Sequence, residues 1–318
     1  MLDKSILENL NTINKRLTSR LISKVEEGNS NSIDILKQIH PKTGKAYKIG
    51  LTGPPGAGKS TLTNQLTKLY RKQNKTVGII AVDPTSPFSG GALLGDRIRM
   101  NEIGSDPGVF IRSMATRGSL GGLSRKSIDA ADVLDAAGYD YIIFETVGVG
   151  QSELDIAQTA DTTIVTLVPE SGDSIQAMKA GLMEIADFFV LNKSDRPGAD
   201  SAQMSLETIL MFRKHDETSW MPRIIKAIAY ENKGITDIAD EIEKHRIFLQ
   251  QSHGLIEKRK HSSKMRVKEI IDNELMDDLW NKERSIQLEE NLINLIDGKI
   301  SPYQLAEDIV QNYKTSFK

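Results

Sequence analysis

The central part of the chain alternates between short apolar runs and amphipathic segments long enough to form helices. Seven of the apolar runs read as strands, at residues 46–52, 76–82, 109–114, 139–145, 162–168, 188–191 and 223–229. Because helix-length segments lie between most of them, we predict an α/β fold with a mainly parallel sheet and helices on both faces. Ligands in such folds bind at the carboxyl ends of the strands, so we expect the site there.

Helical patterns flank this central part on both sides. Near the start, apolar residues at positions 6, 10, 13, 17 and 21 have helical spacing and predict one helix that ends before Gly28. In the tail, apolar residues recur every four positions from 267 to 279, and Gly298 is suited to closing a helix. Residues 301–304 then read as a capping box with proline at the first helical position.

These patterns predict three parts of the chain. They are an N-terminal helical segment at residues 1–45, an α/β domain at 46–250 and a C-terminal helical segment at 251–318. The apolar stripes of the tail need a surface to cover them. That surface is either the α/β domain or a second copy of the chain.

Composition narrows the class of protein. The 318 residues are 39% hydrophobic and carry a formal net charge of -2. The sequence therefore has no overall excess of positive charge that would attract nucleic acid or an anionic membrane. No residue is cysteine, so disulfides and thiolate metal sites are excluded. Charged residues interrupt the first apolar positions, and no run approaches the roughly 20 apolar residues of a membrane span. We expect a cytoplasmic protein with no nucleic acid or membrane partner.

Residues 53–60 read GPPGAGKS and match the pattern GxxxxGK[ST] of a phosphate-binding loop. The match lies between a predicted strand and a predicted helix, which argues against a glycine-rich turn that only happens to precede a helix. Backbone N–H groups of such a loop face the phosphates, Lys59 reaches the β- and γ-phosphates, and Ser60 offers its hydroxyl to Mg²⁺. The predicted nucleotide-binding residues of this segment are Gly53, Pro54, Pro55, Gly56, Ala57, Gly58, Lys59, Ser60 and Thr61.

Residues 192–195 read NKSD, which matches the guanine-reading pattern NKxD at the end of a predicted strand. The Asp195 carboxylate can accept from the ring N1–H and the 2-amino group of guanine, a pairing that adenine does not offer. Asn192 can bond the other edge of the base, and the stem of Lys193 can cover its face. At about 1.5–3 kcal/mol for each hydrogen bond to a charged group, this pair can disfavour ATP by roughly 10²-fold or more.

The next strand ends in Ile228, Ala229 and Tyr230. GTPases often place a Ser-Ala-x turn here, which supports the base through backbone N–H groups. Ile228 departs from the serine of that turn, and the alternative is a simple strand terminus. We retain the three residues as candidate base contacts.

Several carboxylates are candidates for the Mg²⁺ site and for a nucleotide switch. Glu145 ends a strand of β-favouring apolar residues and begins an ExxG sequence whose Gly148 can sense the γ-phosphate through its N–H. Asp83 closes another strand, and Asp96 lies in a segment between strands, where a solvent-exposed acid is the alternative. Mg²⁺ keeps several waters and usually binds only one or two carboxylates beside the phosphates, so some of these three carboxylates act through water. The sequence does not say which.

The residues that promote hydrolysis are less defined. No glutamine follows Gly148 directly, and Gln151 and Glu153 are the candidates for orienting the attacking water. The arginines that could stabilise the transition state are Arg97, Arg117 and Arg125, and nothing in their spacing selects one. We therefore expect slow GTP hydrolysis without a partner, with Lys59, Glu145 and Gln151 as the catalytic candidates.

Four longer strings resemble one family. They are GPPGAGKST at 53–61, GGALLGDRIRM at 90–100, SMATRG at 113–118 and ETVGVGQSE at 145–153. They are similar to the methylmalonyl-CoA mutase-associated P-loop GTPases, the MeaB/ArgK family. The likeness is strong over residues 45 to 250 and extends to the layout of the helical flanks.

The resemblance implies a homodimeric GTPase that binds GTP or GDP with Mg²⁺. Such a protein would act as a chaperone for an adenosylcobalamin-dependent acyl-CoA mutase, with GTP hydrolysis gating cofactor loading and protecting the mutase. By resemblance, Asp83 and Asp96 belong to the first switch, Glu145 begins the second, and residues 168–179 form a third that relays the nucleotide state. The tail would supply the dimer contacts.

Two other functions fit parts of the sequence. One is a kinase linked to transport of lysine, arginine or ornithine, an older label of this family, but no acceptor-side base is visible and NKxD favours guanine. The other is a nickel metallochaperone, which related GTPases are. That role normally uses cysteine and paired histidine ligands, and this chain has no cysteine and no histidine pair at ligand spacing.

Overall fold

The computed structural model describes residues 8–83, 101–115, 125–146, 152–171, 181–212 and 219–315. The chain divides into two compact units, with the boundary between Arg259 and Lys260. The predicted N-terminal helical segment belongs to the same unit as the α/β domain. The second unit contains the rest of the C-terminal helical segment.

Within the described residues, seven strands form one sheet in which every neighbouring pair is parallel, in the order β3-β2-β4-β1-β5-β6-β7. The strands are β1 (Tyr47–Thr52), β2 (Val77–Asp83), β3 (Val109–Ala115), β4 (Tyr141–Thr146), β5 (Thr162–Leu167), β6 (Phe188–Asn192) and β7 (Ile224–Ala227). Each predicted strand is confirmed to within two residues at either end. The first strand along the chain lies in the middle of the sheet, with β4 on one side and β5 on the other.

Helices cover both faces of this sheet. Along β2, Ile80 and Val82 face a core shared with α7, whereas Val77 and Ile79 face a core shared with α4 and α12. Every residue of β4 and of β5 is buried, which explains why these strands read as continuous apolar runs rather than alternating ones. The helices of this unit are α2 (Lys15–Glu26), α3 (Ser30–Ile39), α4 (Lys59–Lys72), α6 (Asn101–Gly104), α7 (Arg125–Ala136), α8 (Ser152–Thr159), α10 (Leu182–Ile185), α11 (Ala199–Met211) and α12 (Ile235–Gln251), with 3₁₀ turns η1 (His40–Lys42), η2 (Pro169–Ser171) and η4 (Ala229–Glu231).

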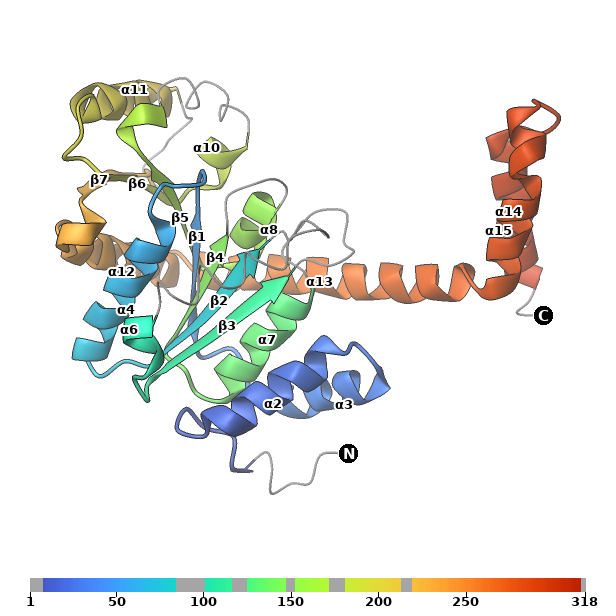
Figure 1. The fold of residues 1–318 in the computed structure, drawn as a ribbon, viewed down its shortest axis with the longest axis horizontal. Helices are drawn as coiled ribbons and strands as arrows, with labels where there is room; N and C mark the ends of the chain where they lie inside the picture. The colour runs from blue at the N-terminus through green and yellow to red at the C-terminus, as the bar shows by residue number, and fades with distance from the viewer. Residues whose placement is uncertain are drawn as a thin grey trace. The chain divides into compact units, whose positions relative to one another are not determined.

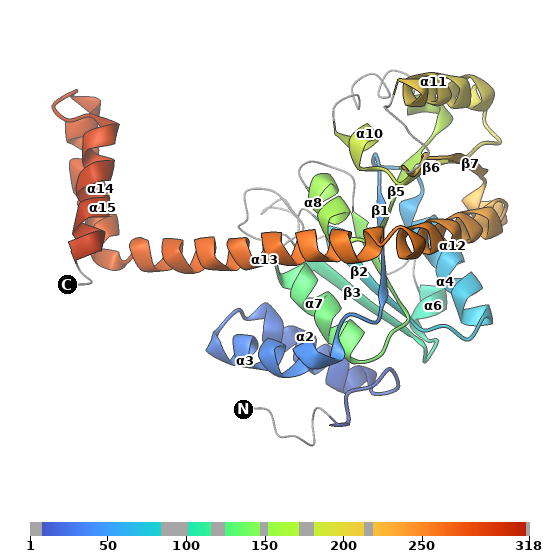
Figure 2. The same ribbon diagram turned by 180° about the vertical axis from the view of Figure 1, so that it is seen from behind.

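The N-terminal helices α2 and α3 pack against α7 in both views of the molecule (Figures 1 and 2). The prediction of one helix from residue 6 to 21 is wrong in its start, because α2 begins at Lys15. The Asn14 side chain accepts from the Leu17 N–H and caps α2, while Asn11 Oδ1 accepts from the Asn14 N–H and shapes the turn before it. Ile13 is 86% exposed, so it does not continue the buried stripe.

The C-terminal helices are α13 (Gly254–Leu279), α14 (Lys282–Ile296) and α15 (Pro302–Thr315). As predicted, Gly298 has a positive φ of 68° just after α14, and the Ser301 hydroxyl accepts from the Gln304 N–H at the start of α15. Val267, Ile271 and Leu275 of α13 are each about half exposed, at 55%, 49% and 51%. Among the described residues, no helix is both long enough and apolar enough to span a membrane.

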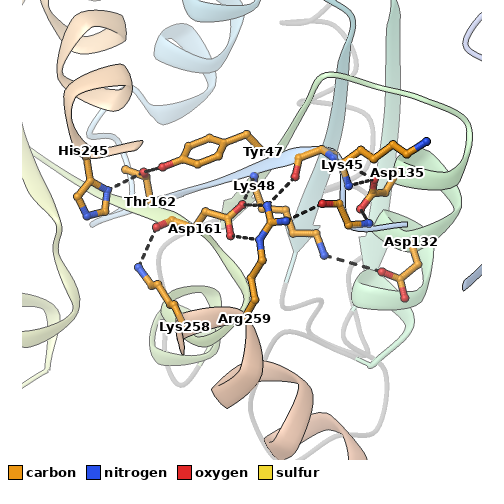
Figure 3. Close-up of polar contacts among 12 residues, drawn as sticks. Lys45, Tyr47, Lys48, Asp132, Asp135, Asp161, Thr162, His245, Lys258 and Arg259 are labelled. Carbon is orange, nitrogen blue, oxygen red and sulfur yellow. Dashed lines mark hydrogen bonds and ion pairs between the residues drawn. The ribbon is translucent and has the colours of Figure 1, made fainter. Parts of the chain in front are cut away.

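A buried polar network crosses the amino ends of β1 and β5 (Figure 3). The Arg259 guanidinium, in the second turn of α13, contacts Asp161 through two hydrogen bonds of 2.9 and 2.7 Å. The same guanidinium donates to the carbonyls of Gly44 and Ala46, which precede β1. Asp161 also accepts from the Lys48 N–H of β1. The planar guanidinium of Arg259 therefore joins the starts of β1 and β5 to the second turn of α13.

His245 of α12 lies in the same network and is 1% exposed. Its Nδ1 lies 2.8 Å from the Thr162 hydroxyl, and its Nε2 lies 3.4 Å from an Asp187 carboxylate oxygen. Burial lowers the pKa of His245 below its usual value, and the nearby Asp187 opposes that effect only in part. The imidazole is thus neutral at neutral pH.

This burial predicts a loss of stability in mild acid. The unfolded chain has the usual histidine pKa of 6.5, so it binds a proton more readily than the folded protein. As the pH falls below 6.5, we expect the free energy of unfolding to fall by up to about 1.4 kcal/mol per pH unit from this group. Urea unfolding of wild type and His245→Gln between pH 7.5 and 5 measures this pH dependence of the free energy of unfolding. Substitution of the exposed His40 by glutamine is the control. An equal pH slope in wild type and His245→Gln would contradict the assignment.

Candidate functional site

The predicted phosphate-binding loop follows β1 and leads into α4 at the carboxyl edge of the sheet. Lys59 is the first residue of α4, and Gly58 caps the helix with a left-handed φ of 89°. The loop therefore sits at the N-terminal, electropositive end of a 14-residue helix. This is the position in which a phosphate gains from both the backbone N–H groups and the helix dipole.

Close approach of neighbouring segments requires glycine at two positions of the loop. A Cβ on Gly53 would lie 2.0 Å from the Thr166 carbonyl oxygen of β5, and one on Gly58 would lie 2.3 Å from Asn192 Nδ2. Gly56 also has a positive φ, of 76°, but nothing would lie within 4 Å of its Cβ. The glycines at 53 and 58 thus allow the loop to pack against β5 and β6.

The polar side chains of the loop are already placed at its centre. Lys59 is 5% exposed, and its Nζ donates to the carbonyls of Gly53 at 2.6 Å and Pro54 at 2.9 Å. The loop thus curls around the ammonium group. The Ser60 hydroxyl lies 2.5 Å from an oxygen of Glu145, which is 6% exposed at the end of β4. The structure therefore places Ser60 against Glu145, with Lys59 next to Ser60 at the start of α4.

Ser60 and Glu145 together fit a magnesium ion. Both supply hard oxygen atoms, which Mg²⁺ prefers, and both lie beside the phosphate loop. Asp83 closes β2, where its backbone is opposite Ala115 of β3, but its side chain lies outside what the structure describes. Asp96, Gly148 and Gln151 also lie outside the described residues. Their proposed roles stay predictions.

The Asn192 side chain connects the predicted base-reading loop to the phosphate loop. This amide is 2% exposed, donates from Nδ2 to the Ala57 carbonyl at 2.8 Å and accepts at Oδ1 from the Ala229 N–H at 3.1 Å. Lys193 has a left-handed φ of 56° and donates from Nζ to the Gly56 carbonyl at 2.8 Å. The guanine-reading and phosphate-binding sequences, far apart along the chain, therefore meet in the fold.

Residues 228–230 stand beside this junction. The Ile228 N–H donates to the Lys233 carbonyl and the Ala229 N–H to Asn192, so both amides hold the loop together. Tyr230 instead offers its side chain, whose hydroxyl donates to Asp195 Oδ2 at 3.2 Å. This hydroxyl and the link from Asn192 to Ala57 could not be predicted, because no pattern in the sequence joins residues so far apart.

A central phosphate loop in an all-parallel sheet, with a guanine-reading loop joined to it, defines a P-loop GTPase. The sequence matches the model of the methylmalonyl Co-A mutase-associated GTPase MeaB family over residues 18–284. The chain belongs to this family, and the fold and resemblance predicted from the sequence are confirmed. Membership supports guanine nucleotide binding and GTP hydrolysis.

Named relatives and a solved structure agree with this assignment. A protein of Pyrococcus abyssi, provisionally named a GTPase, is 47% identical and aligns over 98% of this chain and 96% of its own. GTPase ArgK of Escherichia coli is 36% identical over 89% of this chain and 88% of its own. The crystal structure of a LAO/AO transport system kinase is similar with a TM-score of 0.75 and 26% identity, over 98% of this chain and 97% of that one.

The contact between Gly58 and Asn192 can be tested by adding one methyl group. Gly58→Ala and Gly56→Ala both place alanine at a positive φ, but only the first pushes against the buried amide. We expect Gly58→Ala to lower the free energy of unfolding by about 1–3 kcal/mol more than Gly56→Ala, as overpacking does. Urea unfolding without nucleotide measures both, and equal losses would contradict the packing argument.

Proposed function

We propose that this chain binds and hydrolyses GTP to serve as a chaperone and gatekeeper for an adenosylcobalamin-dependent acyl-CoA mutase of the methylmalonyl-CoA mutase type. Hydrolysis would be coupled to loading of the cobalamin cofactor and to protection of the mutase. The observation that carries the nucleotide part is the buried Asn192 amide, which holds the guanine-reading loop against the phosphate loop. The mutase part rests on the family, whose description names that association.

In this proposal, the loop from Gly53 to Thr61 binds the phosphates, and Lys59 exchanges its loop carbonyls for phosphate oxygens. Ser60 and Glu145 would hold Mg²⁺, with Asp83 and Asp96 as further oxygen donors. When bound, that ion would supply positive charge that neutralises the negative charge on the phosphates. The backbone N–H groups of the remaining loop residues, other than Pro54 and Pro55, which carry none, would fix the phosphates.

Hydrolysis itself would depend on the segment after β4. Gly148 would contact the γ-phosphate, and Gln151 is the proposed residue for orienting water. Because no glutamine follows Gly148 directly, we propose slow turnover until a partner completes the site. Residues 168–179 would report the nucleotide state to the mutase.

A second copy of the chain is the other partner that we propose. The half-exposed apolar side chains of α13, at positions 267, 271 and 275, recur every four residues and form a stripe suited to a helical partner. A homodimer through the C-terminal segment would cover this stripe. We place the assembly in the cytoplasm, with no membrane or nucleic acid partner.

One observation favours a second function. The similar solved structure is titled a transport system kinase, so a kinase linked to amino-acid transport is the alternative. A kinase would leave the γ-phosphate on an acceptor, whereas a GTPase releases it as free phosphate. Measuring both products from GTP separates the two functions.

Guanine reading is tested by changing the oxygen pair of Asp195. Asp195→Asn replaces one acceptor by an N–H donor, which suits the 2-oxo group of xanthine and opposes the 2-amino group of guanine. We expect the affinity for GDP to fall about 10²-fold and that for xanthosine diphosphate to rise. Asp200→Asn, an exposed acid paired with Lys226, is the matched control. Unchanged GDP affinity in Asp195→Asn would contradict the assignment.

The mutase proposal is tested with a cobalamin-dependent mutase encoded beside this chain or in the same genome. We expect co-elution that differs between GDP and a non-hydrolysable GTP analogue, and faster GTP hydrolysis in the complex. Lys59→Ala should abolish the difference between nucleotides, because it removes the charge that holds the phosphates. If no such mutase binds with either nucleotide, the chaperone proposal is wrong while guanine binding stands.

A further inference from the structure

The loop from residue 228 to 233 holds a tyrosine beside the guanine-reading aspartate. Ile228 and Lys233 exchange backbone hydrogen bonds of 3.1 and 3.2 Å, which close the loop at its base. Asn232 takes a left-handed φ of 59° at the end of η4, and the Ala229 N–H is bound to Asn192. The backbone on either side of Tyr230 is therefore fixed.

The Asp195 side chain is less constrained than that of Asn192. Its side chain is exposed, whereas Asn192 is buried and held at both ends of its amide. An exposed carboxylate rotates readily, yet guanine needs its two oxygens in one plane, facing N1–H and the 2-amino group. Ordering such a side chain costs conformational entropy at the moment of binding. A donor that holds the carboxylate beforehand reduces that cost.

The Tyr230 hydroxyl is such a donor, because it lies 3.2 Å from Asp195 Oδ2. A hydrogen bond to Glu231, then loss of solvent and the hydrogen bond to Asp195, raise the pKa of Tyr230 to about 12, so the phenol stays protonated near neutral pH. Lys233 pairs with Glu231 at 2.6 Å, which offsets the like charge beside Asp195. Tyr230 is 61% exposed, so its ring does not fill the core.

We propose that Tyr230 is a specificity-determining positioning residue, whose hydroxyl fixes the rotation of the Asp195 carboxylate toward the N1–H and 2-amino edge of guanine. Each carboxylate oxygen has two acceptor sites, so Oδ2 can accept from Tyr230 and from the base together. The inference rests on the proposed guanine binding. It adds that discrimination depends on a hydroxyl outside the NKxD sequence.

The test compares nucleotides with and without the 2-amino group. Tyr230→Phe keeps the ring and removes the hydroxyl, and isothermal titration with GDP and with inosine diphosphate measures both affinities. We expect GDP affinity to fall about two- to tenfold, as for loss of one hydrogen bond, and inosine diphosphate affinity to fall less. Tyr313→Phe removes the same kind of bond, from Tyr313 to Asp278 at 2.9 Å in the C-terminal unit, and should leave both affinities unchanged.

The outcomes separate this inference from guanine binding itself. A folded Tyr230→Phe variant whose ratio of GDP to inosine diphosphate affinity equals that of wild type overturns the positioning role. That outcome includes an equal loss for both nucleotides, which indicates a general effect on the loop. If wild type does not prefer GDP to ADP and Asp195→Asn changes nothing, guanine reading fails and this inference fails with it.

Discussion

The nucleotide site depends on one buried amide, the side chain of Asn192. It bonds the phosphate loop at Ala57 with its donor and the turn at Ala229 with its acceptor. In a buried setting both halves of an amide must be satisfied, so moving either segment would leave a polar group without a partner. Gly58 is needed for the same reason, because a side chain there would displace the amide. The amide therefore fixes the distance between the loop at Ala57 and the turn at Ala229.

The sheet holds in place the strand that carries this amide. The central strands are buried on both faces, which fixes their register, and their amino ends are joined by the Asp161 and Arg259 pair. The carboxyl ends instead carry the loops in which we propose the nucleotide site. Rigid support at one edge and functional loops at the other is the arrangement that α/β sheets use for binding sites.

Much of this could be predicted from the sequence, and the physical reason is clear. Doubly buried strands read as apolar runs, and the loop and base motifs are local strings, so β1, β6, Lys59 and Asn192 could be assigned directly. The start of α2 at Lys15 could not be predicted, because Ile13 continues the apolar spacing although the chain turns at Asn11. The contact of the Tyr230 hydroxyl with Asp195 could not be predicted either. The two residues are 35 positions apart, and their contact depends on how β6 and β7 align. The structure locates Lys59, Ser60, Glu145 and Asn192, but their roles, like those of Asp83, Asp96 and Gln151, remain predictions.

The guanidinium of Arg259 also determines where this chain can be shortened. Lys258, next to Arg259 in α13, pairs with Asp187 at 2.9 Å. A fragment ending at residue 250, where the strand pattern stops, would lack both Lys258 and Arg259. Asp161, almost wholly buried, and Asp187 would then lose these cationic partners. A buried carboxylate deprived of its partner is strongly destabilising, so such a fragment would be poorly suited to isolation or crystallisation. The nucleotide-binding unit is best produced with its first turns of α13 attached, ending after Arg259 rather than before it.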